Sequence, residues 1–211
     1  MKKKIIVIGY GSIGKKHCRI LRKLKQDYYV ISSQKNIKEQ TTTYEQFKII
    51  NPDYIIIATP TNEHLKNLKK VDSLVKGKII LVEKPLFDVN SNYSPKNNKV
   101  FVGYNLRFNP VIKYLKKINK KNKPINAEIF CGSYLPSWRS RNYINTSSSK
   151  KELGGGVLND LSHEIDYANY IFGDLKKIFK FKSKISNLKI NTDDFAILLC
   201  KKKKIKVLIV L

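Results

Sequence analysis

Apolar runs and amphipathic segments alternate along the first hundred residues of this 211-residue chain. Runs rich in isoleucine and valine predict buried strands at residues 5–8, 28–31, 53–58, 78–82 and 100–103. Between them, helices are predicted at residues 15–25, 44–50 and 64–75. Strands that alternate with helices in this way predict an α/β fold built on a doubly wound parallel sheet.

The pattern changes after residues 88–99, which are rich in Asn, Ser, Pro and Lys and are predicted to form a loop or linker. We place a domain boundary after Gly103, which divides the chain into domains of residues 1–103 and 104–211. The elements predicted for the second domain are a helix at 111–119, a strand at 126–133, a polar stretch at 134–151, an amphipathic helix over 158–172, and strands near 175–185, 192–200 and 205–211.

A glycine-rich turn joins the first predicted strand to the first helix. Gly9, Gly11 and Gly14 have the spacing G-x-G-x-x-G. The first glycine permits a tight turn, the second lets the backbone approach a pyrophosphate, and the third lets the helix pack closely on the strand. The helix N-terminus adds N–H donors and the positive end of a dipole. This loop, with Ser12 and Ile13, is therefore predicted to bind a dinucleotide; the motif alone is weak evidence, and its place between strand and helix strengthens it.

The end of the second predicted strand bears on the choice of dinucleotide. An NAD enzyme carries a carboxylate there for the ribose hydroxyls, whereas this chain has Ser32, Ser33, Gln34 and Lys35. Hydroxyl groups beside a cation accommodate a 2′-phosphate, so NADP is favoured over NAD. The alternative is that the serines are ordinary loop residues and that backbone groups hold an NAD ribose.

Lys84 directly follows a predicted buried strand and precedes Pro85. Parallel sheets place ligands at the carboxyl ends of their strands, and a proline, which can adopt the cis form, fixes the backbone beside the ammonium group. The strand ends marked by Gly9, Ser32, Thr59 and Lys84 should lie on one edge, where one ligand could contact all of them. A solvated lysine at a strand end is the alternative.

The formal net charge of +26 would suit a nucleic-acid partner. However, the excess consists of 37 Lys against 5 Arg, is spread through the chain, and accompanies many Asn and Ile, as codon bias in an AT-rich genome would produce. Arginine, which recognises bases and phosphates bidentately, is scarce. We therefore expect no nucleic-acid partner, although the positive field could attract anionic substrates or cofactors.

Cysteine usage and hydropathy limit the compartment. Cys18, Cys131 and Cys200 are far apart and form no C-x-x-C pair, which fits a reducing cytosol and argues against a zinc site. No segment has the length of a membrane span, and the basic N-terminus with its short apolar run does not resemble a signal peptide. The expectation is a cytoplasmic protein with no bound metal and no membrane partner.

A second candidate site lies at the entrance of the amphipathic helix predicted over residues 158–172, just after three consecutive glycines. Asp160 lies three residues before His163 and Asn159 lies four before it, and both spacings make neighbours on a helix. A carboxylate beside an imidazole fixes its orientation and raises its basicity, which suits a general base. An ordinary surface pair or a helix cap is the alternative.

Five motifs follow one another along the chain: Gly9-x-Gly11-x-x-Gly14, Ala58-Thr59-Pro60-Thr61-Asn62-x-His64, Glu83-Lys84-Pro85, Tyr104-Asn105-x-Arg107-Phe108-x-Pro110 and Gly154-Gly155-Gly156-x-x-x-Asp160-x-x-His163-x-x-Asp166. Their order and spacing, over essentially the whole chain, resemble the Gfo/Idh/MocA oxidoreductase family. The resemblance implies an N-terminal Rossmann domain that binds NAD(P), and a C-terminal α+β domain whose open, mostly antiparallel sheet builds homo-oligomers.

The resemblance also implies roles for particular residues. Lys84 would contact both the nicotinamide and the reacting hydroxyl, and His163 would be the acid/base, assisted by Asp160. The residues implied beside the cofactor are Thr59, Pro60, Asn62, His64 and Glu83. The candidates for holding substrate are Asn105, Arg107, Trp138 and Arg139. The implied reaction is hydride transfer between the nicotinamide and a secondary hydroxyl or ketone of a sugar, nucleotide sugar or cyclitol.

The chain departs from the family pattern in two places. Many relatives have Asp-x-x-x-His where this chain has Asp160-x-x-His163, so the partner of the histidine is Asn159 by spacing or Asp160 by residue type. The sequence also stops inside an apolar run, so we expect a chain shortened at its C-terminus, with an incomplete second sheet. A non-catalytic dinucleotide-binding protein or an inactive fragment is the alternative to an active enzyme.

Overall fold

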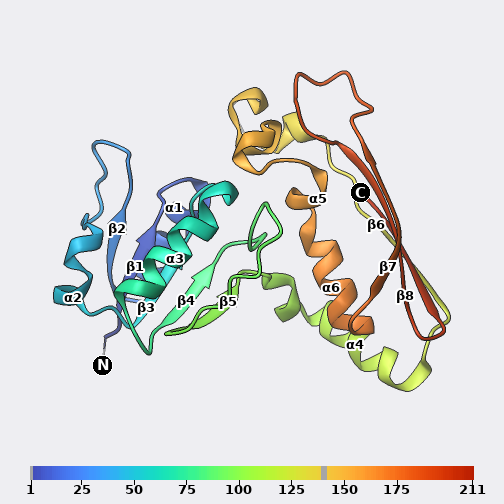
Figure 1. Cartoon of the computed structure of the whole chain (residues 1–211), viewed down its shortest axis with the longest axis horizontal. Helices are drawn as coiled ribbons and strands as arrows, with labels where there is room; N and C mark the ends of the chain where they lie inside the picture. The colour runs from blue at the N-terminus through green and yellow to red at the C-terminus, as the bar shows by residue number, and fades with distance from the viewer. Residues whose placement is uncertain (1, 139–141) are drawn as a thin grey trace. The chain divides into compact units, whose positions relative to one another are not determined.

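The chain divides into two compact units, an N-terminal unit of residues Met1–Gly103 and a C-terminal unit of residues Tyr104–Leu211 (Figure 1). The computed structural model describes residues 2–138 and 142–211. No helix in these described ranges is long and apolar enough to cross a membrane. Each unit is built on its own β-sheet.

The described residues of the N-terminal unit form a five-stranded sheet in the order β2-β1-β3-β4-β5, with every pair of neighbours parallel. The strands are β1 (Lys4–Ile8), β2 (Asp27–Ile31), β3 (Tyr54–Ile57), β4 (Ile79–Val82) and β5 (Lys99–Val102). The helices are α1 (Ser12–Lys23), α2 (Phe47–Ile50) and α3 (His64–Leu74). The predicted doubly wound parallel sheet is confirmed.

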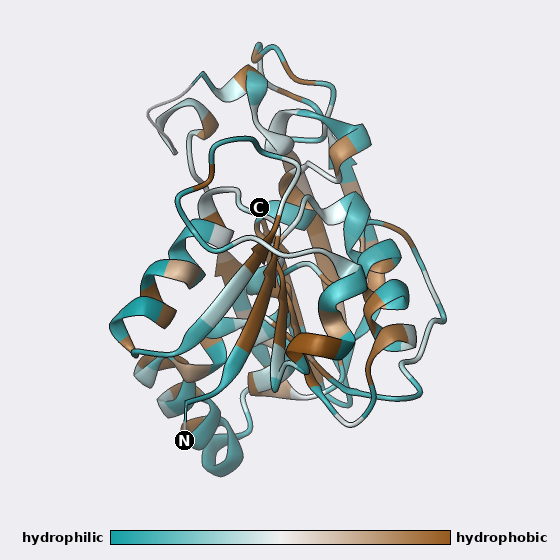
Figure 2. Ribbon diagram, turned by 90° about the vertical axis from the view of Figure 1, so that its left-hand side faces the viewer, coloured by the Kyte–Doolittle hydropathy of each residue, from teal (hydrophilic) through white to brown (hydrophobic). Residues whose placement is uncertain are grey.

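Alternate residues of β1 enter different cores on the two faces of this sheet. Ile6 and Ile8 pack with residues of α2 and α3, whereas Ile5 and Val7 pack with Cys18 and other residues of α1. Apart from a charged first residue in β1, β2 and β5, the strands are accordingly built from apolar and aromatic residues. Figure 2 shows brown strands beside a paler one, among helices and loops of mixed colour. The helices therefore cover both faces of the sheet, and its functional groups can lie only at the strand ends.

The chain changes direction across this sheet between β1 and β3. Beyond β2, Thr41 forms an isolated parallel bridge to Val30, so a single residue stands where a further strand would pair. With that bridge counted, the order matches the 3-2-1-4-5-6 order of a dinucleotide-binding sheet. The carboxyl ends of β1 and β3 then form the topological switch point, where open α/β sheets bind ligands.

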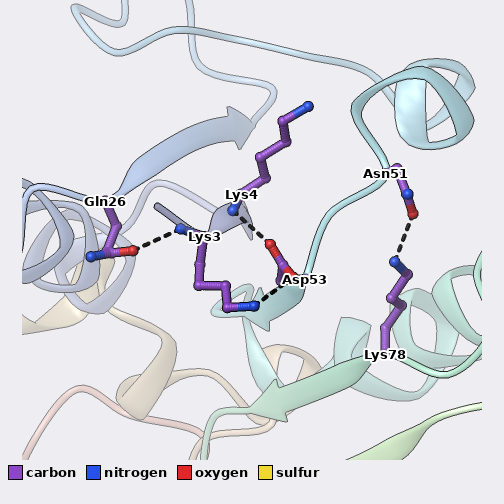
Figure 3. Close-up of polar contacts among 6 residues, drawn as sticks. All are labelled: Lys3, Lys4, Gln26, Asn51, Asp53 and Lys78. Carbon is purple, nitrogen blue, oxygen red and sulfur yellow. Dashed lines mark hydrogen bonds and ion pairs between the residues drawn. The ribbon is translucent and has the colours of Figure 1, made fainter. Parts of the chain in front are cut away.

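The opposite, amino-terminal edge of the sheet is held by charged and amide side chains (Figure 3). The Asp53 carboxylate accepts hydrogen bonds from the Lys4 backbone N–H at 3.0 Å and the Lys3 ammonium at 3.1 Å, and it so joins the starts of β1 and β3. The Lys78 ammonium donates to the Asn51 side-chain oxygen at 2.6 Å. These contacts hold the starts of the strands in place. The polar side chains at this edge therefore have a structural role.

The segment predicted to be a loop or linker at residues 88–99 lacks helix and strand over residues 88–98, whereas Lys99 is the first residue of β5. The segment is tied to α3. Buried Asp72 accepts hydrogen bonds from the Tyr93 hydroxyl at 2.9 Å, the Lys96 backbone N–H at 3.0 Å and the Asn98 side-chain amide at 2.9 Å. Burial by itself would raise the pKa of Asp72, but these hydrogen bonds together outweigh it and lower the pKa. The loop is therefore fastened to α3.

The described residues of the C-terminal unit contain a four-stranded sheet in the order β6-β9-β8-β7. Its strands are β6 (Asn126–Phe130), β7 (Lys176–Ser183), β8 (Phe195–Lys202) and β9 (Ile205–Val210). Its helices are α4 (Pro110–Asn122), α5 (Val157–Asp160) and α6 (Ser162–Phe172). The β7–β8 and β8–β9 pairs are antiparallel and the β6–β9 pair is parallel, which confirms the predicted α+β unit with a mostly antiparallel sheet.

One face of this sheet is covered by α5 and α6. Buried residues of β8 and β9, among them Leu198 and Ile209, pack there against Leu158, Leu161 and Ile165. The predicted amphipathic pattern is therefore right, but the predicted single helix is wrong, because the chain leaves helical geometry at Leu161 and starts a new helix at the next residue. A break of one residue lets the segments on both sides of it pack on the same sheet.

The polar stretch predicted at residues 134–151 is more ordered than expected. Short 3₁₀ turns lie at Leu135–Ser137, Tyr143–Asn145 and Ser147–Ser149 in its described part. Ser148 and Ser149 are buried, and the Ser149 hydroxyl donates to the Ile144 and Thr146 carbonyl oxygens at 2.8 and 2.9 Å. Here a serine hydroxyl donates hydrogen bonds to backbone carbonyl oxygens. The polar composition of the stretch does not show that such bonds give it order.

Candidate functional site

The glycine turn lies at the switch point of the parallel sheet. Gly9 has φ +98°, and a Cβ atom on it would lie 2.5 Å from the Ala58 carbonyl oxygen at the end of β3. A Cβ atom on Gly14 would lie 2.1 Å from the Gly9 carbonyl oxygen. Both positions therefore require glycine, the first for the turn beside β3 and the second for the close approach of α1 to that turn.

Gly11 differs from the other two glycines, because a Cβ atom on it would meet no described heavy atom within 4 Å. It is the N-cap residue of α1, no side chain caps that end, and the first turn holds no acidic residue. The first N–H groups of α1 and its positive dipole end are thus open beside a small residue. This arrangement fits a pyrophosphate, as the sequence predicts.

The segment after β2 carries Ser32, Ser33 and Lys35 near this turn. The Gln34 backbone N–H donates to the Ser32 hydroxyl at 3.0 Å, and the Gln34 side chain donates to the Tyr10 carbonyl oxygen at 3.2 Å. The segment is therefore tied to the glycine turn, while Ser33 and Lys35 are exposed. Their predicted contact with a 2′-phosphate stays a prediction.

Sequence reasoning missed Glu39, the carboxylate that does lie beside this segment. It accepts hydrogen bonds from the hydroxyls of Tyr10, at 3.0 Å, and Tyr28, and it forms an ion pair with Arg22. Burial by itself would raise the pKa of Glu39, but the bonds from Tyr28, Arg22 and Tyr10 lower it. No pattern signals this role, because Glu39 lies well past the end of β2.

The end of β3 carries Thr59, Pro60 and Asn62, and the last two are exposed. His64, predicted to lie beside a cofactor, is only 1% exposed. Its Nδ1 lies 2.9 Å from the Pro85 carbonyl oxygen and its Nε2 lies 3.0 Å from the Thr59 carbonyl oxygen. Both ring nitrogens therefore contact backbone carbonyl oxygens. His64 connects the segments after two strands, and its ring is not open to a ligand.

Glu83, Lys84 and Pro85 follow β4, and the Lys84–Pro85 peptide bond is cis. The Glu83 carboxylate lies 2.7 Å from Nε2 of His17 on α1, a residue that sequence reasoning did not select. Lys84 itself is partly exposed at the same sheet edge as the glycine turn and Thr59. The predicted alignment of the strand ends at one edge is confirmed.

In the C-terminal unit, His163 lies in the first turn of α6, and Asp160 is the last residue of α5. The ring of His163 meets the Tyr104 ring edge to face, with centroids 5.7 Å apart. Asp160 accepts a hydrogen bond from the Ser148 hydroxyl at 3.1 Å, and the Asn159 side chain donates to the Gly154 carbonyl oxygen at 3.0 Å. Because the helix breaks between them, Asp160 and His163 are not neighbours on one helix, and the orienting role stays a prediction.

Two of the three glycines before α5, Gly155 and Gly156, let neighbouring segments approach. A Cβ atom on Gly155 would lie 2.2 Å from the Ser147 carbonyl oxygen. Buried Thr192 donates to the Ser148 carbonyl oxygen at 3.2 Å, and the Val157 N–H donates to the Asp193 carbonyl oxygen at 2.9 Å. The start of α5 is therefore held by turns on both sides, and sequence reasoning missed Ser148 and Thr192.

The predicted substrate residues occupy different places. Arg107 donates two hydrogen bonds to buried Asp166 on α6, from Nε at 2.8 Å and from one terminal nitrogen at 2.6 Å. These two nitrogens are therefore engaged with α6. Arg107 also lines a groove of about 400 Å³ with Lys116 and Tyr170. Asn105 is exposed, the Trp138 indole donates to the Ser133 hydroxyl at 2.5 Å, and Arg139 lies outside the described residues.

The residues described by the structure contain no group of three or more His, Cys, Asp or Glu side chains that could hold a metal ion. The thiols also differ from reactive ones, since burial raises the pKa of Cys18 and of Cys131 to about 11.

No protein-family model and no curated protein sequence matches this chain. Solved structures do. The WlbA dehydrogenase from Bordetella pertussis, in complex with NADH and UDP-GlcNAcA, is 15% identical with a TM-score of 0.77 over 100% of this chain and 71% of that one. An oxidoreductase from Desulfitobacterium hafniense, described as NADPH-dependent, is 15% identical with a TM-score of 0.80 over 99% and 66%.

A third match is the WlbA dehydrogenase from Thermus thermophilus, in complex with NAD and alpha-ketoglutarate, at 16% identity and a TM-score of 0.68 over 100% and 73%. The chain therefore has the fold of Gfo/Idh/MocA-type oxidoreductases, as the five motifs indicate. It spans 66–73% of the length of these three chains.

Proposed function

We propose that this chain belongs to the Gfo/Idh/MocA family and is an NAD(P)-dependent oxidoreductase. In this proposal it transfers a hydride between a nicotinamide and a secondary hydroxyl or ketone of a sugar, nucleotide sugar or cyclitol. The main support is the open N-terminus of α1 at the switch point, with Lys84 on the same sheet edge. The B. pertussis WlbA dehydrogenase, with the same fold, was solved with NADH and a nucleotide sugar.

Each unit contributes a part of the proposed mechanism. The glycine turn and α1 bind the pyrophosphate, and the exposed strand-end residues Pro60 and Asn62 line the nicotinamide half. The bound nicotinamide would accept or donate the hydride. The Lys84 ammonium orients the substrate hydroxyl and stabilises the negative charge on its oxygen, and His163 takes the hydroxyl proton in the direction of oxidation.

The first experiment is a titration of the protein with NADH and with NADPH, followed by nicotinamide fluorescence. We expect saturable binding of at least one of them, and no change with either would overturn the proposal. Turnover is then measured with a panel of sugars, nucleotide sugars and cyclitols. Lys84→Ala and His163→Ala are each expected to reduce turnover by at least about 100-fold, the usual size of a lost acid/base or charge-stabilising group. Binding without turnover of any panel member would indicate a non-catalytic dinucleotide-binding protein.

We propose NADP as the preferred cofactor, on the absence of a carboxylate among residues 32–35 and the exposure of Ser33 and Lys35. Lys35→Ala should weaken NADPH binding by about tenfold and leave NADH binding unchanged, because it removes one charged contact with the 2′-phosphate. Lys38→Ala, at an exposed position in the same segment, is the matched control. Equal affinity of the wild type for both nucleotides would remove the preference.

We propose that the open face of the C-terminal sheet joins copies of this chain. The register places two rows of mostly apolar residues on the face away from the helices: Phe181, Ile197, Val210 and Phe130 form one row, and Phe179, Leu199 and Leu208 lie in the next, which ends at Glu128. Phe130 is 80% exposed and Phe181 46%. Exposed apolar patches of this kind mark association surfaces. Phe181→Glu should reduce the mass measured by light scattering, and Phe101→Glu, at an equally exposed phenylalanine of β5, should not.

A further inference from the structure

The sequence contains three histidines, and the proposed mechanism uses only His163. The other two, His17 and His64, lie in the N-terminal unit on different helices. Each of them contacts one of the two residues that flank Lys84 in the sequence. The catalytic lysine of the proposed function therefore lies in a segment that histidines hold on both sides.

His17 holds the residue before Lys84. Its Nε2 lies 2.7 Å from Oε1 of Glu83, and both side chains are about one-fifth exposed. The Glu83 carboxylate also fills the space beside Gly103, where an added Cβ atom would lie 3.1 Å from Oε2. Glu83 is thus confined between α1 and the end of β5, so its backbone cannot rotate freely away from the sheet edge.

His64 holds the residue after Lys84. Its Nδ1 contacts the Pro85 carbonyl oxygen and its Nε2 contacts the Thr59 carbonyl oxygen. Both oxygens can only accept hydrogen bonds, and a neutral imidazole carries one N–H, so in that form the ring donates to one of them and only contacts the other. The Thr59 hydroxyl is itself fixed, because it accepts a hydrogen bond from the Asn67 amide at 3.2 Å. The buried imidazole so ties the segment after β4 to the segment after β3.

We propose that His17 and His64 are positioning residues that set the direction of the Lys84 side chain by fixing Glu83 and Pro85. The placement of Lys84 is a property of the cofactor-free protein, and its catalytic consequence rests on the proposed function. A lysine on a loop has four rotatable side-chain bonds, so a fixed backbone on both sides is needed to aim its ammonium.

The test observes Lys84 directly, without substrate or cofactor. Lysines are ¹³C-dimethylated, and the Lys84 resonance is assigned by its loss in Lys84→Arg. His64→Phe, which removes both contacts, should move that resonance, and so should His64→Gln, which cannot reach Pro85 with the geometry of Nδ1. His64→Asn keeps a donor at the place of Nδ1 and should restore the wild-type position.

His17 is tested in the same way. His17→Leu should move the Lys84 resonance and His17→Gln, which keeps a donor near the place of Nε2, should restore it. Arg22→Gln is the control, since Arg22 lies on the same helix but pairs with Glu39. A Lys84 resonance that stays unchanged in folded His17→Leu and His64→Gln proteins would overturn the inference. Because His17 is less buried than His64, its variant remains informative if a substitution of His64 prevents folding.

Binding provides the link to function. In His17→Leu, affinity for NADH should fall about tenfold, the size of one lost charged hydrogen bond, whereas affinity for ADP-ribose should not change. In a Lys84→Ala background the same substitution should have no further effect on NADH, since interacting residues are not additive. Additive losses would contradict action through Lys84. A wild-type protein that binds neither NADH nor NADPH would remove the proposed function, and the resonance measurement would still decide the positioning.

Discussion

The two units hold their candidate residues by different means. In the N-terminal unit, the glycine turn, Thr59 and Lys84 follow strands of one parallel sheet, and the ladder continues into them: the Gly9 N–H donates to the Ile31 carbonyl oxygen at 2.8 Å and the Glu83 N–H donates to the Ile57 carbonyl oxygen at 2.9 Å. In the C-terminal unit, Asp160 ends a helix of four residues that is held by turns. The first site is set by a sheet, the second by contacts between turns.

The difference predicts how the stability of each unit responds to a substitution. A sheet with helices on both faces cannot yield locally, because every strand is fixed by its neighbours. Turns joined by single hydrogen bonds, such as Thr192 to Ser148 and Asn191 to Ser149, can shift with less disturbance of the core. The same steric change should therefore destabilise the N-terminal unit more than the C-terminal unit.

The largest effect is expected for Gly14→Ala. Its Cβ atom would lie 2.1 Å from the Gly9 carbonyl oxygen, a backbone atom that is itself confined by the end of β3. Since neither α1 nor the turn can move without disturbing the sheet, we expect a loss of about 3 kcal/mol in the free energy of unfolding. Urea unfolding followed by circular dichroism measures it.

Gly11→Ala in the same turn is the matched control. The described structure offers open space to its Cβ atom, and the φ of −71° suits any residue, so stability should change by less than about 0.5 kcal/mol. The methyl group would instead lie where the pyrophosphate approaches, and NADH affinity should fall at least about tenfold. If Gly11→Ala bound NADH as the wild type does, the pyrophosphate would have to lie elsewhere.

Gly155→Ala makes nearly the same clash in the C-terminal unit. Its Cβ atom would lie 2.2 Å from the Ser147 carbonyl oxygen and 2.6 Å from that of Ser148. Because these atoms belong to a short 3₁₀ turn, we expect it to move and the loss to be about 2 kcal/mol. Gly132→Ala, whose nearest neighbour would be the Phe130 ring at 3.5 Å, should be close to neutral.

The same urea titrations decide whether the two units differ. A loss for Gly155→Ala that equals or exceeds the loss for Gly14→Ala would show that the turns are as rigid as the sheet. Amide exchange of peptides from each unit shows where the stability is lost. Gly14→Ala should accelerate exchange in residues of the parallel sheet, and Gly155→Ala should accelerate it around Ser148 and Thr192.

The same contrast explains how much could be predicted from sequence. Buried parallel strands are continuous apolar runs, and their carboxyl ends share one edge, so Gly9, Thr59 and Lys84 could be brought together without a structure. Partners from distant segments carry no such signal: His17 and Glu39 lie at positions where nothing in the pattern marks a contact. The motif also does not show that the His64 side chain is buried, because burial depends on where the side chain points in the folded protein.

In the C-terminal unit the elements were predictable and their junctions were not. The apolar spacing of α5 and α6 gives the correct buried side, but hydrophobic periodicity is insensitive to a one-residue break such as Leu161. Buried hydroxyls such as that of Ser149 bind local backbone carbonyl oxygens, so the segment has the composition of an ordinary loop. The predicted pairing of Asp160 with His163 depends on this junction, and it stays a prediction.

The smallest expected effects test a device that both units share, a carboxylate that fastens a loop. Asp72 binds the segment around Lys96, and Asp194 accepts hydrogen bonds from the Ile185 N–H at 2.7 Å and the Ser186 N–H at 3.2 Å. For each, burial alone would raise the pKa, but the hydrogen bonds it accepts lower it overall. A pKa lower in the folded than in the unfolded state means that the unfolded state binds more protons in acid, so this stabilisation is present above the unfolded value of about 3.9 and is lost as the pH falls below it.

Asp72→Asn and Asp194→Asn should each lower the free energy of unfolding at pH 7 by about 1–2 kcal/mol, because an amide cannot accept all of these hydrogen bonds. At pH 3, where the wild-type carboxylates begin to take up protons, each variant should lie closer to the wild type than it does at pH 7. Urea titrations at the two pH values measure the difference. A gap between wild type and variant that stays constant or widens on acidification would contradict the role of the carboxylate charge. Should the gap narrow for Asp72 alone, loop fastening by charge would belong to the parallel-sheet unit, and the turns around Asp194 would owe their order to neutral hydrogen bonds.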